Sequence, residues 1–127
     1  MSLSDCLYEI ATLVQQEILD TGTVIVNGQL SFRNSLRDNP YAGLCHRAAL
    51  KVKELAPDLE MFLLSFECGG ETLFSRSRHV VALVAAAEGE YIVDPTIQQY
   101  LPNAKAVYAP GEKYPLSMEG KVCRMKV

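Results

Sequence analysis

Three residues in the middle of the chain have the chemical types that cysteine-dependent catalysis needs, namely Cys45, His79 and Asp94. A thiol nucleophile needs a base within hydrogen-bond reach, and a third group must fix the orientation and tautomer of that base. A cysteine, a histidine and an aspartate occur in that order along the chain. The sequence therefore predicts thiol chemistry, provided that the neighbouring elements bring these three side chains together.

Cys45 stands where a polar loop containing Pro40 and Gly43 runs into a helical pattern over residues 45–55. The first N–H groups of a helix have no partner inside the helix, and the helix dipole concentrates partial positive charge there. A thiolate is stabilised at such a position, which favours the nucleophilic form near neutral pH. The plainer interpretation is a cysteine packed in the core as a small apolar side chain.

His79 and Asp94 belong to two successive strands, expected over residues 79–84 and 90–94. His79 opens the first strand and is expected to point toward the start of the helix. Asp94 closes the second strand. The plainer interpretations are a solvated histidine at a strand edge and an aspartate that caps a helical turn beginning at Pro95.

The register of the hairpin formed by these two strands decides whether His79 and Asp94 can meet. A turn centred on residues 86–87 places the two residues directly opposite each other, and a turn one residue later makes them diagonal neighbours within side-chain reach. A turn centred on residues 88–89 would pair Asp94 with Leu83 and separate the two. The pairing of His79 with Asp94 is thus a prediction about register.

Two neighbours of Cys45 could take part in the same chemistry. The side-chain amide of Asn39 is a candidate second donor, beside the Cys45 N–H, for an oxyanion. Alternatively, Asn39 is a turn residue before Pro40. His46 is the competing base, but successive helical residues point about 100° apart, so His46 is expected to line a groove or to be exposed.

Other uses of these residue types find little support in the spacing. The chain has no C-x-x-C pair and no H-x₃-H pair, so a metal site is not expected. It also lacks a glycine-rich phosphate-binding loop, so nucleotide binding is not expected. A metal site would have to be assembled from scattered side chains: Cys45, His46, Cys68 and His79.

Composition and charge describe an ordinary globular chain. Its 127 residues, 49% of them hydrophobic and 21% charged, are expected to form one domain over residues 1–127. The net charge of −3, without a basic run, disfavours nucleic acid as a partner. The longest apolar run, residues 80–87, is too short to cross a membrane. Four widely spaced cysteines and no visible secretory signal predict a reduced, cytoplasmic protein; this prediction leaves export by a non-classical secretion system open.

The periodicity of the chain predicts an α+β fold, with helices in the first half and a mostly antiparallel sheet in the second. An Asn-Gly pair at residues 27–28 indicates a tight hairpin between two short strands. A flexible turn is expected at residues 68–71 and a loop at 72–77. The expected helices are 2–20 and 45–55, with a short helical turn at 95–100, and the expected strands are 23–26, 29–32, 59–66, 79–84, 90–94, 104–109 and 120–127.

Three short segments resemble the papain-like superfamily in its broad sense, which includes transglutaminase-like domains, NlpC/P60-like domains, and papain-like bacterial toxin or protein-deamidase domains. They are residues 44–49 (LCHRAA), 79–84 (HVVALV) and 91–96 (YIVDPT). Asn39 lies six residues before the cysteine, a spacing similar to that of the oxyanion-hole glutamine in papain-like peptidases. The resemblance implies a papain-like core, in which a nucleophile helix packs on the sheet.

The resemblance also implies an activity. Cys45 would attack an amide carbon of a peptide or protein substrate, His79 would shuttle the proton and Asp94 would orient His79, with no cofactor. The enzyme would be a peptidase, a protein deamidase or a transglutaminase-like protein. Two other hypotheses stay open, namely a non-catalytic binding or regulatory module with the same fold, and a redox sensor that pairs Cys45 with Cys68.

Overall fold

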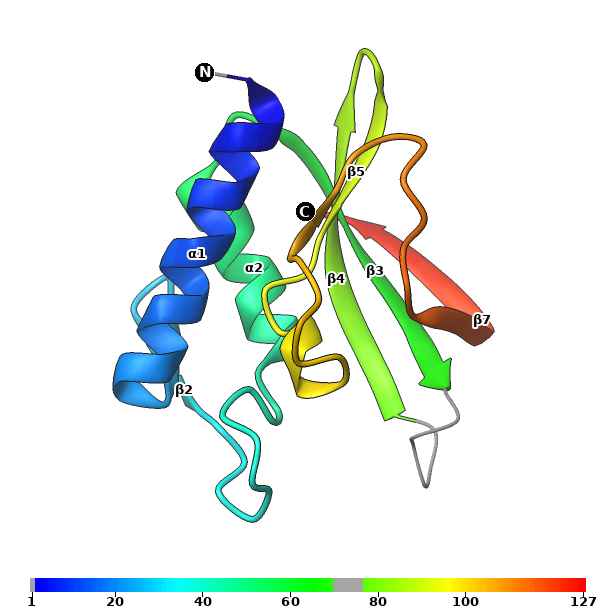
Figure 1. Cartoon of the computed structure of the whole chain (residues 1–127). Helices are drawn as coiled ribbons and strands as arrows, with labels where there is room; N and C mark the ends of the chain where they lie inside the picture. Colours follow the sequence, from blue (N-terminus) through cyan, green and yellow to red (C-terminus); the bar gives the residue numbers. More distant parts are fainter. Residues whose placement is uncertain (1, 70–76) are drawn as a thin grey trace.

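The computed structural model describes residues 2–69 and 77–127, which form two helices and two antiparallel sheets (Figure 1). The α+β class predicted from the sequence is therefore confirmed. In chain order the elements are α1 (Leu3–Thr21), β1 (Thr23–Val26), β2 (Gln29–Phe32), α2 (Cys45–Leu55), β3 (Glu60–Gly69), β4 (Ser77–Ala86), β5 (Gly89–Val93), the 3₁₀ turn η1 (Ile97–Gln99), β6 (Val107–Tyr108) and β7 (Ser117–Lys126).

The main sheet has five strands in the order β6-β5-β4-β3-β7, and every neighbouring pair is antiparallel. β4 is the central strand, as its apolar sequence predicts. β3 continues through Cys68 and Gly69, so the expected turn does not begin at Cys68. Residues 70–76, which include the second half of that turn and most of the loop after it, lie outside the described residues.

Helix α1 covers Leu3–Thr21, one residue later at each end than the expected range 2–20. The side chain of Ser2 accepts a hydrogen bond from the Asp5 N–H, and Gly22 ends the helix in the left-handed conformation with φ of 68°. One face of the helix is buried, and its members recur at helical spacing: Leu7, Ala11, Val14 and Ile18.

The β1–β2 hairpin forms a separate two-stranded sheet beside the helices. Asn27 and Gly28 take positive φ values of 49° and 77°, as a tight primed turn requires. Side chains from both helices bind the free edge of β1, because Glu17 accepts the Ile25 N–H and Lys51 donates to the Ile25 carbonyl. The hairpin is thereby joined to the helical layer.

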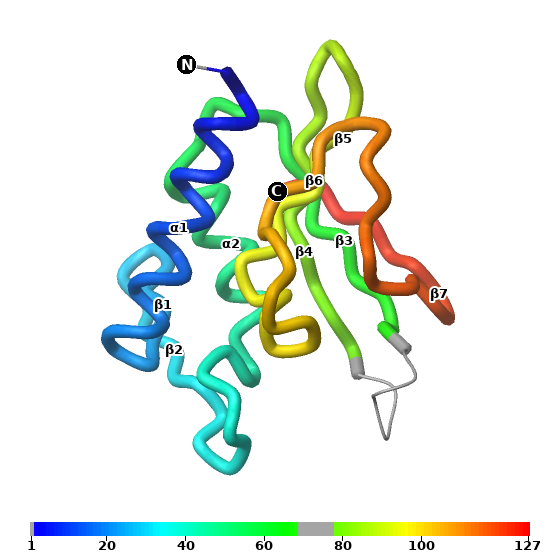
Figure 2. The backbone as a smooth tube through the Cα atoms, viewed as in Figure 1, coloured from blue at the N-terminus to red at the C-terminus, as the bar shows by residue number. Residues whose placement is uncertain are grey.

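The two faces of the main sheet carry two hydrophobic clusters. The larger cluster lies between the sheet and the two helices, which cover the same face (Figure 1). The smaller cluster lies on the opposite face, where the segment between β5 and β7 crosses the strands (Figure 2). Its buried members are Phe66, Cys68, Val81, Ile97, Tyr108 and Leu116. Both faces of the central strands are therefore covered.

None of the helices in the described residues combines the length and the apolar character needed to cross a membrane.

Candidate catalytic site

Cys45 is the first residue of α2, as the sequence predicts, and its side chain is half-buried. Small residues one turn further on, Ala48 and Ala49, are fully buried, which lets the helix lie close to the sheet. The residue before the helix is Leu44, whose side chain has no acceptor for the first helical N–H groups. In contrast to α1, which Ser2 caps, α2 leaves backbone donors available beside the thiol.

The turn between β4 and β5 occupies residues 87–88, because Ala86 pairs with Gly89 and Ala82 pairs with Val93. Continued past its last pair, this register makes His79 and Asp94 diagonal neighbours. The two side chains meet, since His79 Nε2 lies 2.8 Å from Asp94 Oδ2. The prediction that the hairpin register lets them meet is confirmed.

His79 and Asp94 both have a relative exposure of 0%. The interpretation of His79 as a solvated residue is therefore wrong. The interpretation of Asp94 as an N-cap is also wrong, because the 3₁₀ turn begins after Thr96 and only the backbone carbonyl of Asp94 accepts from Ile97. The carboxylate of Asp94 is directed at the imidazole instead.

The backbone around Asp94 is held from two sides. Its N–H donates to the carbonyl of Ala106 at 2.7 Å, which joins it to the segment before β6. The next carbonyl, that of Pro95, accepts from the side-chain amide of Gln15 on α1 at 3.1 Å. These contacts place Asp94 at the end of β5, where its side chain can reach β4.

Aromatic rings enclose the imidazole of His79. Phe66, the strand partner of His79 on β3, meets it edge-on with ring centroids 5.7 Å apart. Tyr100, just after η1, meets it edge-on at 5.1 Å. The ring is therefore fixed by packing as well as by its hydrogen bond, and solvent does not reach it.

Cys45 lies close enough to the His79 ring to affect its protonation. Burial lowers the pKa of His79, but the hydrogen bond with Asp94 and the interaction with the Cys45 thiol outweigh burial and raise the pKa to about 9. Asp94 occupies Nε2 of the ring. The other ring nitrogen, Nδ1, is buried and makes no hydrogen bond to the described residues.

A fourth side chain, which the sequence did not indicate, contacts the same group. The hydroxyl of Tyr114 donates to Asp94 Oδ2 at 2.6 Å, the oxygen that also binds His79. Tyr114 lies in a Pro- and Gly-containing segment without periodicity, so no spacing rule pointed to it. Burial, followed by the nearby Asp94 carboxylate, raises the pKa of Tyr114, and its hydroxyl therefore stays protonated as a donor.

Asn39 occupies the loop before α2 and acts there as a turn residue. Its side-chain oxygen accepts the N–H of Tyr41 at 2.9 Å. The hydroxyl of Tyr41 in turn donates to Gln98 of η1 at 3.2 Å, which ties this loop to the segment after Asp94. The role of the Asn39 amide in an oxyanion hole stays a prediction.

His46, the competing base, is exposed on the surface of α2. It borders a pocket of about 330 Å³ between the helix and the sheet, which agrees with its expected place beside a groove. The other lining residues come from β3, β4 and β7: Leu63, Ser65, Val80, Cys123 and Met125.

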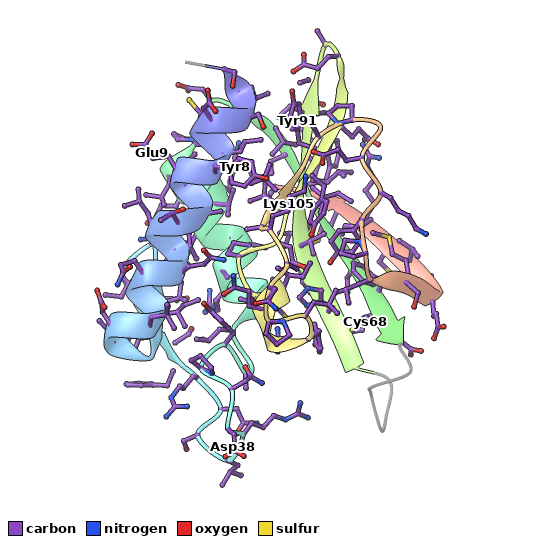
Figure 3. All side chains as sticks on the ribbon, viewed as in Figure 1. Tyr8, Glu9, Asp38, Cys68, Tyr91 and Lys105 are labelled. Carbon is purple, nitrogen blue, oxygen red and sulfur yellow. The ribbon has the colours of Figure 1, made fainter. Side chains whose placement is uncertain are left out.

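None of the four cysteines is part of a disulfide. Cys6 and Cys123 are half-buried, whereas Cys68 is fully buried near the end of β3 (Figure 3). Burial raises the pKa of Cys68, although an interaction with Tyr100 partly opposes that effect. Within residues 2–69 and 77–127, no group of three or more histidine, cysteine or acidic side chains is arranged to hold a metal ion.

No protein-family model, curated protein or solved structure matches this chain.

Proposed function

We propose that this protein is a cysteine-dependent hydrolase or acyl-transfer enzyme that acts on an amide bond. The observation that carries the proposal is the fully buried hydrogen bond of 2.8 Å between His79 and Asp94, next to a cysteine at a helix start. Thiol catalysis requires a cysteine, a base near it and a carboxylate that orients the base.

The charge state of the site supports this chemistry. Because the pKa of His79 is raised to about 9, its ring carries a proton at neutral pH. An imidazolium next to Cys45 stabilises a thiolate, and the partial positive charge at the start of α2 acts in the same direction. The nucleophile and the proton donor are then present together before substrate binds.

In the proposed reaction, the Cys45 thiolate adds to the carbonyl carbon of an amide, and the carbonyl oxygen becomes an oxyanion. Backbone N–H groups in the first turn of α2, including that of Cys45, are available to stabilise this oxyanion because Leu44 does not cap them. The Asn39 side-chain amide is the proposed second donor.

Collapse of the tetrahedral intermediate breaks the C–N bond and leaves a thioester on Cys45. His79 gives its proton to the leaving nitrogen, so that the nitrogen departs as ammonia or an amine. Water or an acceptor amine then attacks the thioester and returns a proton to His79, which regenerates the thiolate and the imidazolium. Asp94 keeps the ring in the required orientation throughout, and no cofactor takes part.

The proposed substrate is a peptide or protein. The order of a cysteine on a helix, a histidine on a strand and an aspartate after the next strand resembles the papain-like superfamily, whose members cleave peptide bonds, side-chain amides or cell-wall peptides. We propose a papain-like core on the same basis. The chemistry of the site is the same for each of these amides, so assay of the products must distinguish them.

The test is a panel of amide substrates that contains peptides and proteins with exposed glutamine, scored separately for released ammonia and for new amino termini. The wild-type protein is expected to release one of the two. Cys45→Ser is expected to abolish release, since a hydroxyl is a much weaker nucleophile at this position.

Cys123→Ser is the matched control, because Cys123 is also a free, half-buried thiol but lies on β7. It is expected to keep the wild-type rate. Release that survives in Cys45→Ser, or absence of release from every amide in the panel, would contradict the proposal.

A further inference from the structure

One oxygen of Asp94 accepts two hydrogen bonds, whereas the other accepts none from the described residues. His79 Nε2 and the Tyr114 hydroxyl lie 2.8 and 2.6 Å from Oδ2, and Oδ1 is buried without a partner there. The two donors therefore share the same acceptor, so that each one affects the strength of the other.

We propose that Tyr114 is a positioning residue that acts through Asp94 to orient His79 and to set the pH range in which His79 carries its proton. This inference rests on the proposed function for its catalytic meaning. It extends the arrangement of Cys45, His79 and Asp94 by a fourth side chain that comes from a different part of the fold, the segment between β6 and β7.

The ring of Tyr114 is itself held in place by aromatic neighbours. It meets Phe66 edge-on with centroids 6.1 Å apart and Tyr108 edge-on at 5.4 Å. Phe66 also packs edge-on against His79, so one aromatic ring contacts both donors to Asp94. Packing of the ring therefore directs the Tyr114 hydroxyl toward the Asp94 carboxylate.

The direction of the effect follows from the shared oxygen. A hydrogen bond donated to a carboxylate draws negative charge toward the donor, which weakens the attraction of that oxygen for a second donor. Tyr114 thus moderates the influence of Asp94 on His79. Without the tyrosine hydroxyl, the Asp94 carboxylate would attract the His79 proton more strongly. His79 would therefore keep its proton to a higher pH.

Other titratable groups also surround this cluster and must stay in place during a test. Cys45 faces His79 from α2, and Cys68 on β3 lies near Asp94, Cys45 and Tyr100. Tyr108 of β6 lies near Asp94 as well, with the Lys105 ammonium over its ring at 5.1 Å from the centroid. A substitution that removes only the hydroxyl of Tyr114 leaves all of these groups unchanged.

The experiment is an NMR titration of the histidine rings in the whole 127-residue chain. The chain has two histidines, so His46→Asn assigns the two signals. In Tyr114→Phe, the titration midpoint of His79 is expected to move upward by roughly a few tenths of a pH unit, because the hydrogen bond from Tyr114 exists in both protonation states of His79 and only its change in strength shifts the midpoint. In Asp94→Asn, it is expected to move downward, because the charge that raises it is lost.

Tyr108→Phe is the matched control, because Tyr108 belongs to the same aromatic cluster and makes no described hydrogen bond to Asp94. In Tyr108→Phe, the titration midpoint of His79 is expected to equal that of the wild type. The pH above which amide cleavage declines should follow the His79 midpoint in each variant. An unchanged or lowered midpoint in Tyr114→Phe would overturn the inference. Because the titration needs no substrate, failure of the amide assay alone would count against the proposed function and not against the role of Tyr114.

Discussion

At the residue scale, the site depends on the Asp94 carboxyl group, which the protein buries away from water. Burial of a charged carboxylate without a partner costs on the order of several kcal/mol, because the charge loses its hydration. Asp94 offsets that cost with two short hydrogen bonds to Oδ2 and with a cationic neighbour. The hydrogen bond with Asp94 also raises the pKa of His79, although burial of the ring acts in the opposite direction.

Cys68 shows how the same side chain behaves when burial dominates. It is fully buried on β3, and its pKa is raised. Because the thiolate is the reactive form of cysteine, Cys68 is expected to be a poor nucleophile although it lies near Asp94. Cys45 differs in being half-buried, at a helix start and beside a protonated ring.

At the scale of elements, the β4–β5 hairpin determines whether the site exists at all. Its turn at residues 87–88 sets the register that brings His79 and Asp94 together, and Gly89 follows that turn with φ of 136°. A Cβ atom on Gly89 would lie 2.8 Å from the Cβ of Pro110, in the segment that carries Tyr114. The absence of a side chain at Gly89 thus allows the hairpin to lie close to the segment between β6 and β7.

Gly89→Ala is therefore expected to destabilise the protein and to loosen the site. Strain at positive φ alone costs about 1–2 kcal/mol, and the contact with Pro110 adds to it. Gly28→Ala is the matched control, because Gly28 has φ of 77° but no atom within 4 Å of the added Cβ. Urea unfolding should show a larger loss in Gly89→Ala. Equal losses in the two variants would contradict the account.

The sequence predicted the elements of this site better than it predicted their contacts. Helix α2 was predicted with its observed bounds, because Cys45 follows a polar loop and apolar residues recur at helical spacing. The hairpin register was left open, because residues 80–87 are apolar without alternation and so do not distinguish the two faces of a strand. Tyr114 was missed because its contact joins residues 20 positions apart, through a segment without a repeating pattern.

At the scale of the whole molecule, the site couples stability to pH. The pKa of His79 is about 9 in the folded protein and about 6.5 in an unfolded chain, so folding favours the protonated ring. This contribution is complete below about pH 6.5 and is lost as pH rises toward about 9. Protonated His79 thus stabilises the fold most strongly below about pH 6.5.

The contribution of His79 to the free energy of unfolding is accordingly expected to fall between about pH 6.5 and 9, by about 3 kcal/mol. Urea unfolding at a series of pH values measures this slope. Asp94→Asn should reduce it, whereas Asp38→Asn, at an exposed loop position away from the sheet (Figure 3), should keep it. A slope that is the same in wild type and Asp94→Asn would show that the pair does not control the titration.

The measurement that tests the central claim most directly is the rate at which iodoacetamide modifies each cysteine at about pH 6, followed by mass spectrometry of the peptides. In the wild type, Cys45 is expected to react at least about tenfold faster than Cys6 and Cys123, because His79 stabilises its thiolate. The advantage should disappear in His79→Asn and persist in His46→Asn, which alters the exposed neighbouring histidine. A Cys45 that reacts no faster than the other two thiols, or equally fast without His79, would contradict the account.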